Sequence, residues 1–74
     1  MPVPAHRADF GIRVRELRKE RGWSQEELAH QADLDRSYVG GVERGQRNVS
    51  LDNIHKLAKT LDVSPGTLFG CNER

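Results

Sequence analysis

Cysteine, aromatic residues and long apolar runs are all scarce in this 74-residue sequence. One cysteine cannot form an internal disulfide, and no apolar run approaches the roughly 20 residues that a membrane span requires. The first residues also lack the charged and then apolar plan of a signal peptide. These absences predict a cytoplasmic protein in a reducing environment, without a membrane partner.

The sequence also lacks an excess of one charge: it has 12 lysines and arginines and 11 aspartates and glutamates, for a net charge of +1. The distribution of the charges is therefore more informative than their sum. The three histidines and the one cysteine lack the spacing of metal ligands, and no glycine-rich phosphate loop or activated nucleophile is present. The sequence predicts no metal, no cofactor and no enzymatic activity.

A chain of this length forms one domain and can bury only about 60% of its unfolded surface. Because the core is so small, packing against a second copy of the chain would add to its stability. Residues 1–7 contain Pro2 and Pro4 and no apolar periodicity, which predicts a flexible arm. We expect the folded domain at 8–70 and a short tail at 71–74.

Two short helices joined by a tight turn are predicted for residues 24–45, SQEELAHQADLDRSYVGGVERG. Ser24 is followed three residues later by Glu27, a spacing in which each side chain can bond the other's backbone N–H. Asp33 occupies the turn, where the backbone must be left-handed and Asp is tolerated. Asp35 can cap the second helix. This pattern is typical of a helix-turn-helix whose second helix enters the DNA major groove.

The second helix of this pair has a buried and a free face at about 100° per residue. We expect Val39, Val42 and Glu43 on the buried face, and Ser37, Gly40, Gly41 and Arg44 on the free face. Arg36 and Tyr38 flank the free face near the end that contacts bases. Adjacent glycines cost roughly 1 kcal/mol each in a helix. Either Gly40 permits close helix packing, or Gly41 lets the backbone approach the groove floor.

Three further helices complete the expected all-α fold. The first spans about 9–21, with Phe10, Val14 and Leu17 facing the core. The fourth spans 51–61, and its core face is expected to carry Leu51, Ile54, Leu57, Ala58 and Leu61. A brief fifth helix starts after Ser64, with proline at its first position.

The pieces ERGWSQEELA, LDRSYVGGVERGQRNVSL and LAKTLDVSP resemble the Cro/C1-type helix-turn-helix family of transcriptional regulators. The resemblance covers about Phe10 to Phe69. The run LDRSYVGGVERGQRN most resembles the controller proteins of restriction-modification systems, although prophage-type repressors and antitoxins share much of it. The resemblance implies a compact, five-helix, lambda-repressor-like domain that binds a palindromic DNA operator as a homodimer.

The resemblance also implies roles for single residues. The base-reading positions of the family fall on Arg36, Ser37 and Gly41, and Arg36 is expected to make the main contact. Because Gly41 has no side chain, a longer or shape-dependent operator is favoured. The phosphate contacts are expected from Gln25, Tyr38, Arg44, Arg47 and Asn48.

Three structural or partner contacts follow from the same resemblance. Arg18 pairs with Glu43 in a largely buried ion pair that holds the recognition helix against the first helix. Leu68 and Phe69 fall where the family often forms its dimer contact, although they can instead close the core beneath the fourth helix. Glu26 matches a position at which activators of this family touch RNA polymerase.

A rival interpretation is a protein-interaction module, antitoxin-like, that keeps the fold without reading DNA. The cations and the glutamine at the motif's open side favour DNA. The sequence therefore predicts a sequence-specific regulator of transcription, either activator or repressor, that binds double-stranded DNA.

Overall fold

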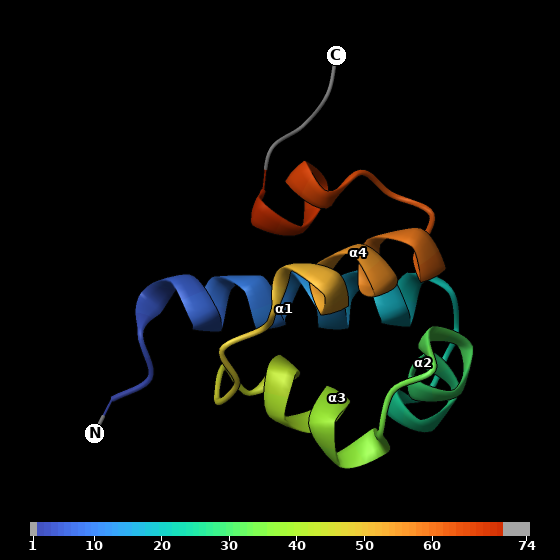
Figure 1. Ribbon diagram of the computed structural model, residues 1–74, viewed down its shortest axis with the longest axis horizontal. Coiled ribbons are helices and arrows are strands. Elements are labelled where there is room, and N and C mark those ends of the chain that lie inside the picture. The colour runs from blue at the N-terminus through green and yellow to red at the C-terminus, as the bar shows by residue number, and fades with distance from the viewer. Residues whose placement is uncertain (1, 71–74) are drawn as a thin grey trace.

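A computed structural model describes residues 2–70 and is helical throughout its regular parts (Figure 1). The elements in chain order are α1 (Ala5–Glu20), α2 (Gln25–Ala32), α3 (Arg36–Glu43), α4 (Leu51–Thr60) and η1 (Pro65–Phe69). The all-α fold is confirmed, but the fifth helix is a 3-10 helix, η1, rather than an α-helix. No helix within residues 2–70 is long and apolar enough to cross a membrane. The predicted tail at 71–74 lies outside the described residues.

Helix α1 begins earlier than its sequence pattern indicates, at Ala5 rather than Asp9. Residues 5–7, expected in the N-terminal arm, form its first turn, and the Pro4 carbonyl accepts a backbone hydrogen bond from Ala8 at 3.1 Å. The reason lies in a tertiary contact. A Cβ atom built on Gly45 would lie 2.6 Å from Cγ1 of Val3, so the start of the chain packs directly against the end of α3.

The close crossing of α1 and α3 depends on Gly11. A Cβ atom at this position would lie 2.4 Å from the carbonyl oxygen of Val42 and 2.6 Å from that of Glu43. These atoms belong to backbone, which cannot move aside as a flexible side chain can. Gly11 therefore sets the distance at which the recognition helix is held against α1.

Apolar side chains from all five elements meet in a single core. Its members, all buried, are Phe10, Val14, Leu28, Ala29, Ala32, Val39, Val42, Leu57, Ala58, Leu61 and Leu68. The expectation for Leu51 was wrong, because this residue is 69% exposed. It lies in the first turn of α4, at the end of the helix that follows the loop after α3.

The turn of the helix-turn-helix follows the sequence closely. The Ser24 hydroxyl accepts a hydrogen bond from the backbone N–H of Glu27 at 3.0 Å, and Asp33 adopts the left-handed conformation at φ 57° and ψ 48°. Only half of the predicted capping box forms. The Glu27 carboxylate accepts a hydrogen bond from Gln31 at 2.8 Å, one turn further along α2, instead of reaching back to Ser24.

Candidate nucleic-acid interface

Helix α3 lies at one edge of the molecule, with α1 and α2 packed behind it (Figure 1). Val39 and Val42 point inward and are each 1% exposed, whereas Arg36, Ser37 and Arg44 are exposed. The predicted free face is therefore present at Ser37 and Arg44, but the expectation was wrong for Gly40 and Gly41, which are buried. The exposed part of this face is polar.

The first turn of α3 carries a small hydrogen-bonded cluster. The Asp35 carboxylate caps the helix by accepting from the backbone N–H of Ser37 at 2.9 Å, and it also accepts from the Ser37 hydroxyl. The hydroxyl bond above all, followed by the backbone bond, holds the pKa of Asp35 below its ordinary value. Arg36 is exposed beside this cluster, so donor and acceptor groups lie next to each other at the start of the helix.

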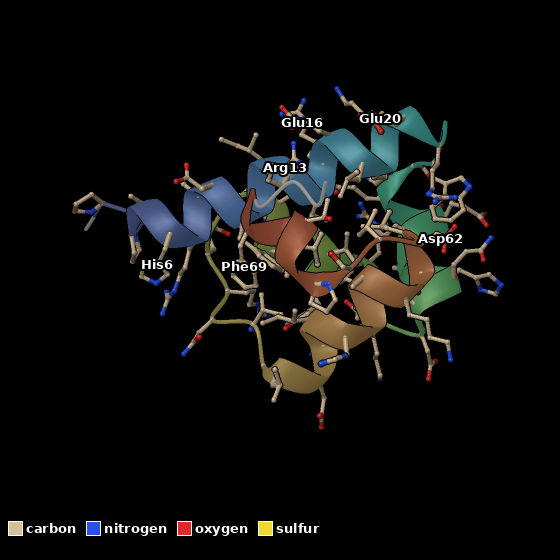
Figure 2. The ribbon with its side chains drawn as sticks, turned by 90° about the horizontal axis from the view of Figure 1, so that it is seen from above. His6, Arg13, Glu16, Glu20, Asp62 and Phe69 are labelled. Atoms are coloured by element: carbon tan, nitrogen blue, oxygen red, sulfur yellow. The ribbon has the colours of Figure 1, made fainter. Side chains whose placement is uncertain are left out.

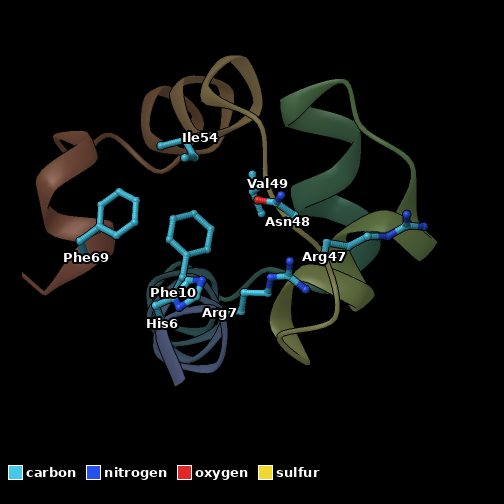
Figure 3. A pocket seen from close by; sticks show the side chains of 8 residues that line it. All are labelled: His6, Arg7, Phe10, Arg47, Asn48, Val49, Ile54 and Phe69. Carbon is cyan, nitrogen blue, oxygen red and sulfur yellow. The ribbon is translucent and has the colours of Figure 1, made fainter. Parts of the chain in front are cut away.

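Gly41 was expected on the free face, but it is buried, because the side chain of Arg47 covers it. A Cβ atom on Gly41 would lie 3.1 Å from Cγ and 3.3 Å from Nε of Arg47. The Arg47 guanidinium continues over the Tyr38 ring, with Cζ 5.3 Å from the ring centroid. In Figure 3 the Arg47 side chain extends away from the nearby pocket. The glycine thus makes room for an arginine that belongs to the following loop.

The adjacent Gly40 has a similar relation to two other predicted phosphate-binding residues. A Cβ atom there would lie 3.1 Å from Nη1 of Arg44 and 3.4 Å from Oε1 of Gln25. Arg44 is exposed and donates through Nε to the Gln46 side chain at 3.1 Å. The two glycines together let long polar side chains lie close to the α3 backbone.

Arg18 and Glu43 form an ion pair that links α1 to the end of α3. Arg18 Nε lies 2.6 Å and Nη2 3.0 Å from the two Glu43 carboxylate oxygens, and the side chains are only 9% and 3% exposed. The hydrogen bond to Glu43 raises the pKa of Arg18, partly offset by burial. Glu43 also accepts from Gln25 Nε2 at 3.0 Å, and Arg18 Nη1 donates to the Trp23 carbonyl at 2.7 Å.

This network joins the structural pair to the free face. Because Gln25 donates one amide hydrogen to Glu43, its orientation at the start of α2 is fixed, and the second amide hydrogen is available to a ligand. Tyr38 is fixed in a similar way, since its hydroxyl accepts from Asn53 Nδ2 at 3.0 Å and keeps its own hydrogen to donate.

The two residues predicted at a dimer contact have different environments. Leu68 is fully buried in the core of the protomer, so its side chain closes the core, as the alternative interpretation held. Phe69 is 59% exposed and packs against Phe10, with ring centroids 5.2 Å apart and the rings tilted at 45° (Figure 3). A pocket of about 140 Å³ adjoins these two rings (Figure 3). Of these two residues, Phe69 is the one that a second copy could contact.

The remaining predicted residues are exposed. Glu26 lies in the first turn of α2, and Asn48 lies in the loop after α3, at the edge of the pocket. Arg7 was expected in a flexible arm, through which it could contact DNA, but it lies in α1 and lines the same pocket as Arg47 and Asn48. Its place beside this loop depends on the packing of α1 on the end of α3, which no local sequence signal indicates.

Three comparisons extend these observations. The sequence model of the helix-turn-helix family matches residues 14–68, which include α2, α3 and α4. Control protein C.BamHI from Bacillus amyloliquefaciens is 52% identical over 61 residues, 81% of this chain and 75% of that relative. The crystal structure of the restriction-modification controller protein C.AhdI from Aeromonas hydrophila has a TM-score of 0.87 and 64% identity, over 89% of this chain and 100% of that one.

A further structure shows a relative with its DNA. The restriction-modification controller protein C.Esp1396I, as a tetramer in complex with its natural 35 base-pair operator, has a TM-score of 0.81 and 31% identity, over 90% of this chain and 88% of that one. Family match and fold agree over most of the chain. The chain therefore belongs to the Cro/C1-type helix-turn-helix family, and control proteins of restriction-modification systems are among its relatives.

Proposed function

We propose that this protein is a transcriptional regulator that binds a palindromic operator in double-stranded DNA as a homodimer, and that it controls a restriction-modification system. The observation that carries the proposal is the free face of α3, which has exposed donors and acceptors in its first turn, the cation Arg44 at its C-terminal cap and the loop cation Arg47 over Gly41. The names of the relatives, C.BamHI and C.AhdI, support the restriction-modification context. Such a regulator acts on DNA in the cytoplasm.

Arg36 makes the principal base contact in this proposal. It is exposed in the first turn of α3, the end from which this motif reaches base edges. Its guanidinium can bond to O6 and N7 of guanine together, a contact worth about 1–3 kcal/mol. Ser37, exposed beside it, contacts a second base, whereas the role of Gly41 is to accommodate Arg47.

Phosphate contacts surround this base-reading turn. The residues proposed for them are Gln25, Tyr38, Arg44, Arg47 and Asn48. The fixed orientations of Gln25 and Tyr38 support the assignment, because preoriented donors lose less conformational freedom on binding. Each cation that neutralises a phosphate releases counterions, so the operator affinity should fall steeply with salt concentration.

A homodimer places two copies of α3 on the operator, with half-sites about 34 Å or a multiple of it apart. The exposed Phe69 is the proposed centre of the contact between copies, because its ring extends the apolar surface of Phe10 beyond the protomer. Leu68 supports it from within the core.

RNA polymerase is a proposed partner when the regulator activates transcription. Glu26 is exposed in the first turn of α2, beside the DNA-facing helix but outside it. The charge reversal Glu26→Lys should abolish activation in a reconstituted transcription assay while operator affinity persists. Loss of both activities would remove this role.

The selection of binding duplexes from a random pool tests the DNA-binding proposal. The wild-type protein, Arg36→Ala and the control variant Lys59→Ala are selected in parallel. Lys59 is an exposed cation of α4, so its removal changes the net charge equally without touching α3. We expect a two-fold symmetric motif from the wild type and from Lys59→Ala, and loss of one specific base per half-site from Arg36→Ala.

Two results would contradict the proposal. Enrichment of no sequence by the wild type, combined with copurification of a protein from the host, would favour the protein-interaction module. Selection of a motif without two-fold symmetry would support sequence-specific DNA binding but contradict binding as a homodimer.

A further inference from the structure

The hydroxyl group of Ser37 is already committed to a partner within the protein. It donates its hydrogen to Oδ2 of Asp35, the same oxygen that accepts the Ser37 backbone N–H at 2.9 Å. An ionised carboxylate can only accept hydrogen bonds, so the hydroxyl must be the donor in this pair. These bonds from Ser37 lower the pKa of Asp35 and so favour its ionised form.

Ser37 therefore differs from a serine whose hydroxyl rotates freely. A free hydroxyl offers one donor and two acceptor lone pairs, and it turns to suit its ligand. With its hydrogen held by Asp35, the Ser37 oxygen retains only lone pairs to offer. Arg36 beside it has donors and no acceptor. The first turn of α3 thus presents a donor group and an acceptor group side by side.

The major groove of DNA contains few partners for an acceptor. Its hydrogen-bond donors are the amino groups of adenine N6 and cytosine N4, whereas N7, O6 and O4 accept. The negative charge of Asp35 adds to this preference, because it attracts an amino hydrogen and repels both acceptor oxygens and phosphates. The pair is consequently suited to a base amino group rather than to the DNA backbone.

We propose that Asp35 is a specificity-determining residue, which fixes Ser37 as an acceptor and so makes the pair read a base amino group, adenine N6 or cytosine N4, in each half-site. The inference rests on the proposed function, since it requires α3 to lie in the major groove. It adds a direction, acceptor rather than donor, to the base contact proposed for Ser37.

Base analogues test this polarity directly. In the duplex selected by the wild type, each adenine is replaced in turn by purine and each cytosine by 2-pyrimidinone, which removes the amino group alone. Replacement of guanine by 7-deazaguanine removes an acceptor instead. Dissociation constants are measured by fluorescence anisotropy for the wild type, Ser37→Ala, Ser37→Thr and Asp35→Asn. Asn caps a helix as well as Asp does, and thermal unfolding verifies that each variant is folded.

We expect one amino deletion per half-site to weaken wild-type binding about 3- to 10-fold, the range of a single hydrogen bond. The same deletion should leave Ser37→Ala unaffected and retain its effect in Ser37→Thr, which keeps the hydroxyl. In Asp35→Asn the penalty should shrink, because a neutral amide oxygen holds the hydroxyl hydrogen less strongly than a carboxylate does and the negative charge beside the base is removed.

Other outcomes would overturn the inference. If removal of an acceptor atom from a base weakens binding by the wild type but not by Ser37→Ala, the Ser37 hydroxyl donates to that base. If deletion of the amino group weakens binding by Asp35→Asn as much as by the wild type, Asp35 has no part in base recognition, although Ser37 does. A wild-type protein that selects no duplex would instead refute the proposed function itself, so the two failures are distinguishable.

Discussion

The α3 face and the η1 face of this molecule expose opposite kinds of side chain. On the α3 face the exposed groups are polar, and several are held by internal bonds, as Ser37 is by Asp35 and Arg44 by Gln46. On the η1 face and at the start of α4, Phe69 and Leu51 are 59% and 69% exposed. Figure 1 places α3 and η1 at opposite edges of the molecule.

This difference indicates two kinds of partner. Cations and oriented donors gain from a phosphate backbone, and that gain weakens as salt is added. Exposed apolar surface gains about 25 cal/mol per Å² when it is buried, with little dependence on moderate salt. Charged side chains of α1 lie beside η1, among them Arg13, which pairs with Glu16 at 3.1 Å and donates to the Thr67 carbonyl of η1 at 3.4 Å (Figure 2). Mutations should therefore separate operator binding from dimer formation.

The largest expected effect, on the free energy of unfolding, comes from Glu43→Gln, which breaks the ion pair between Arg18 of α1 and the end of α3. The substitution keeps the shape of the side chain but leaves the Arg18 charge, 9% exposed, without its counterion. Removal of one partner of a buried ion pair costs about 3–5 kcal/mol, a large part of the stability of so small a domain. Urea unfolding at one fixed protein concentration measures the loss.

The double variant Arg18→Met with Glu43→Leu is the matched control. Because it removes both charges, it should recover much of the stability that Glu43→Gln loses. It should not recover operator affinity, since Gln25 no longer has the carboxylate that orients it. An unfolding midpoint of Glu43→Gln equal to that of the wild type would refute the role of the pair.

A smaller effect is expected from Phe69→Asp, which acts on the η1 face alone. A carboxylate at the centre of the proposed contact must be desolvated in each copy, at a cost of about 2 kcal/mol or more, the size of an interface hot spot. The dimer dissociation constant should rise at least about 30-fold in sedimentation equilibrium. Far-ultraviolet circular dichroism should change little, because the wild-type ring is mostly exposed.

Ser24→Asp provides the control for added charge. It introduces the same negative charge at an exposed helix cap, where Asp is as good a residue as Ser, and should leave the dimer intact. If the Phe69→Asp dimer is as stable as that of the wild type, the dimer contact does not include Phe69. Leu51, which is also exposed, would then be the next residue to test.

The sequence predicts well those features that depend on neighbours in the chain. The cap at Ser24, the left-handed Asp33 and the two faces of α3 all follow from spacing within a turn or two. The ion pair of Arg18 with Glu43 was implied by family resemblance, since no local rule connects residues so far apart. Its geometry is now explicit, with Gln25 as an additional member.

The features that the sequence did not predict depend on contacts between distant segments. Helix α1 extends back to Ala5 because Val3 packs on Gly45. Leu51 has the spacing of a core residue, but no part of the described chain buries its side chain. Gly41 has the spacing of a free face, yet a loop arginine folds back over it. Periodicity reports the side of a helix, not what the rest of the chain places there.

The smallest effect, and the most specific, is expected from Gly41→Ala. The new Cβ would lie 3.1 Å from Cγ of Arg47, so this side chain must shift by a few tenths of an ångström, which disturbs its contact with the Tyr38 ring. Because a flexible side chain gives way, the fold should survive, and stability should stay equal or rise by up to about 1 kcal/mol from helix propensity. Operator affinity, measured by anisotropy, should fall by a few-fold at most, because the cation–π contact that is weakened is worth about 0.5–1 kcal/mol.

Two explanations of Gly41 are separated by repeating the substitution in an Arg47→Ala background. If the glycine serves to position Arg47, alanine has no further effect on affinity once that arginine is absent, and the double-mutant cycle shows full coupling. If the glycine instead lets the α3 backbone approach the groove floor, alanine lowers affinity equally in both backgrounds. Gly11→Ala should differ from either result, since its Cβ meets backbone oxygen at 2.4 Å and overpacking of this kind lowers stability by about 1–3 kcal/mol.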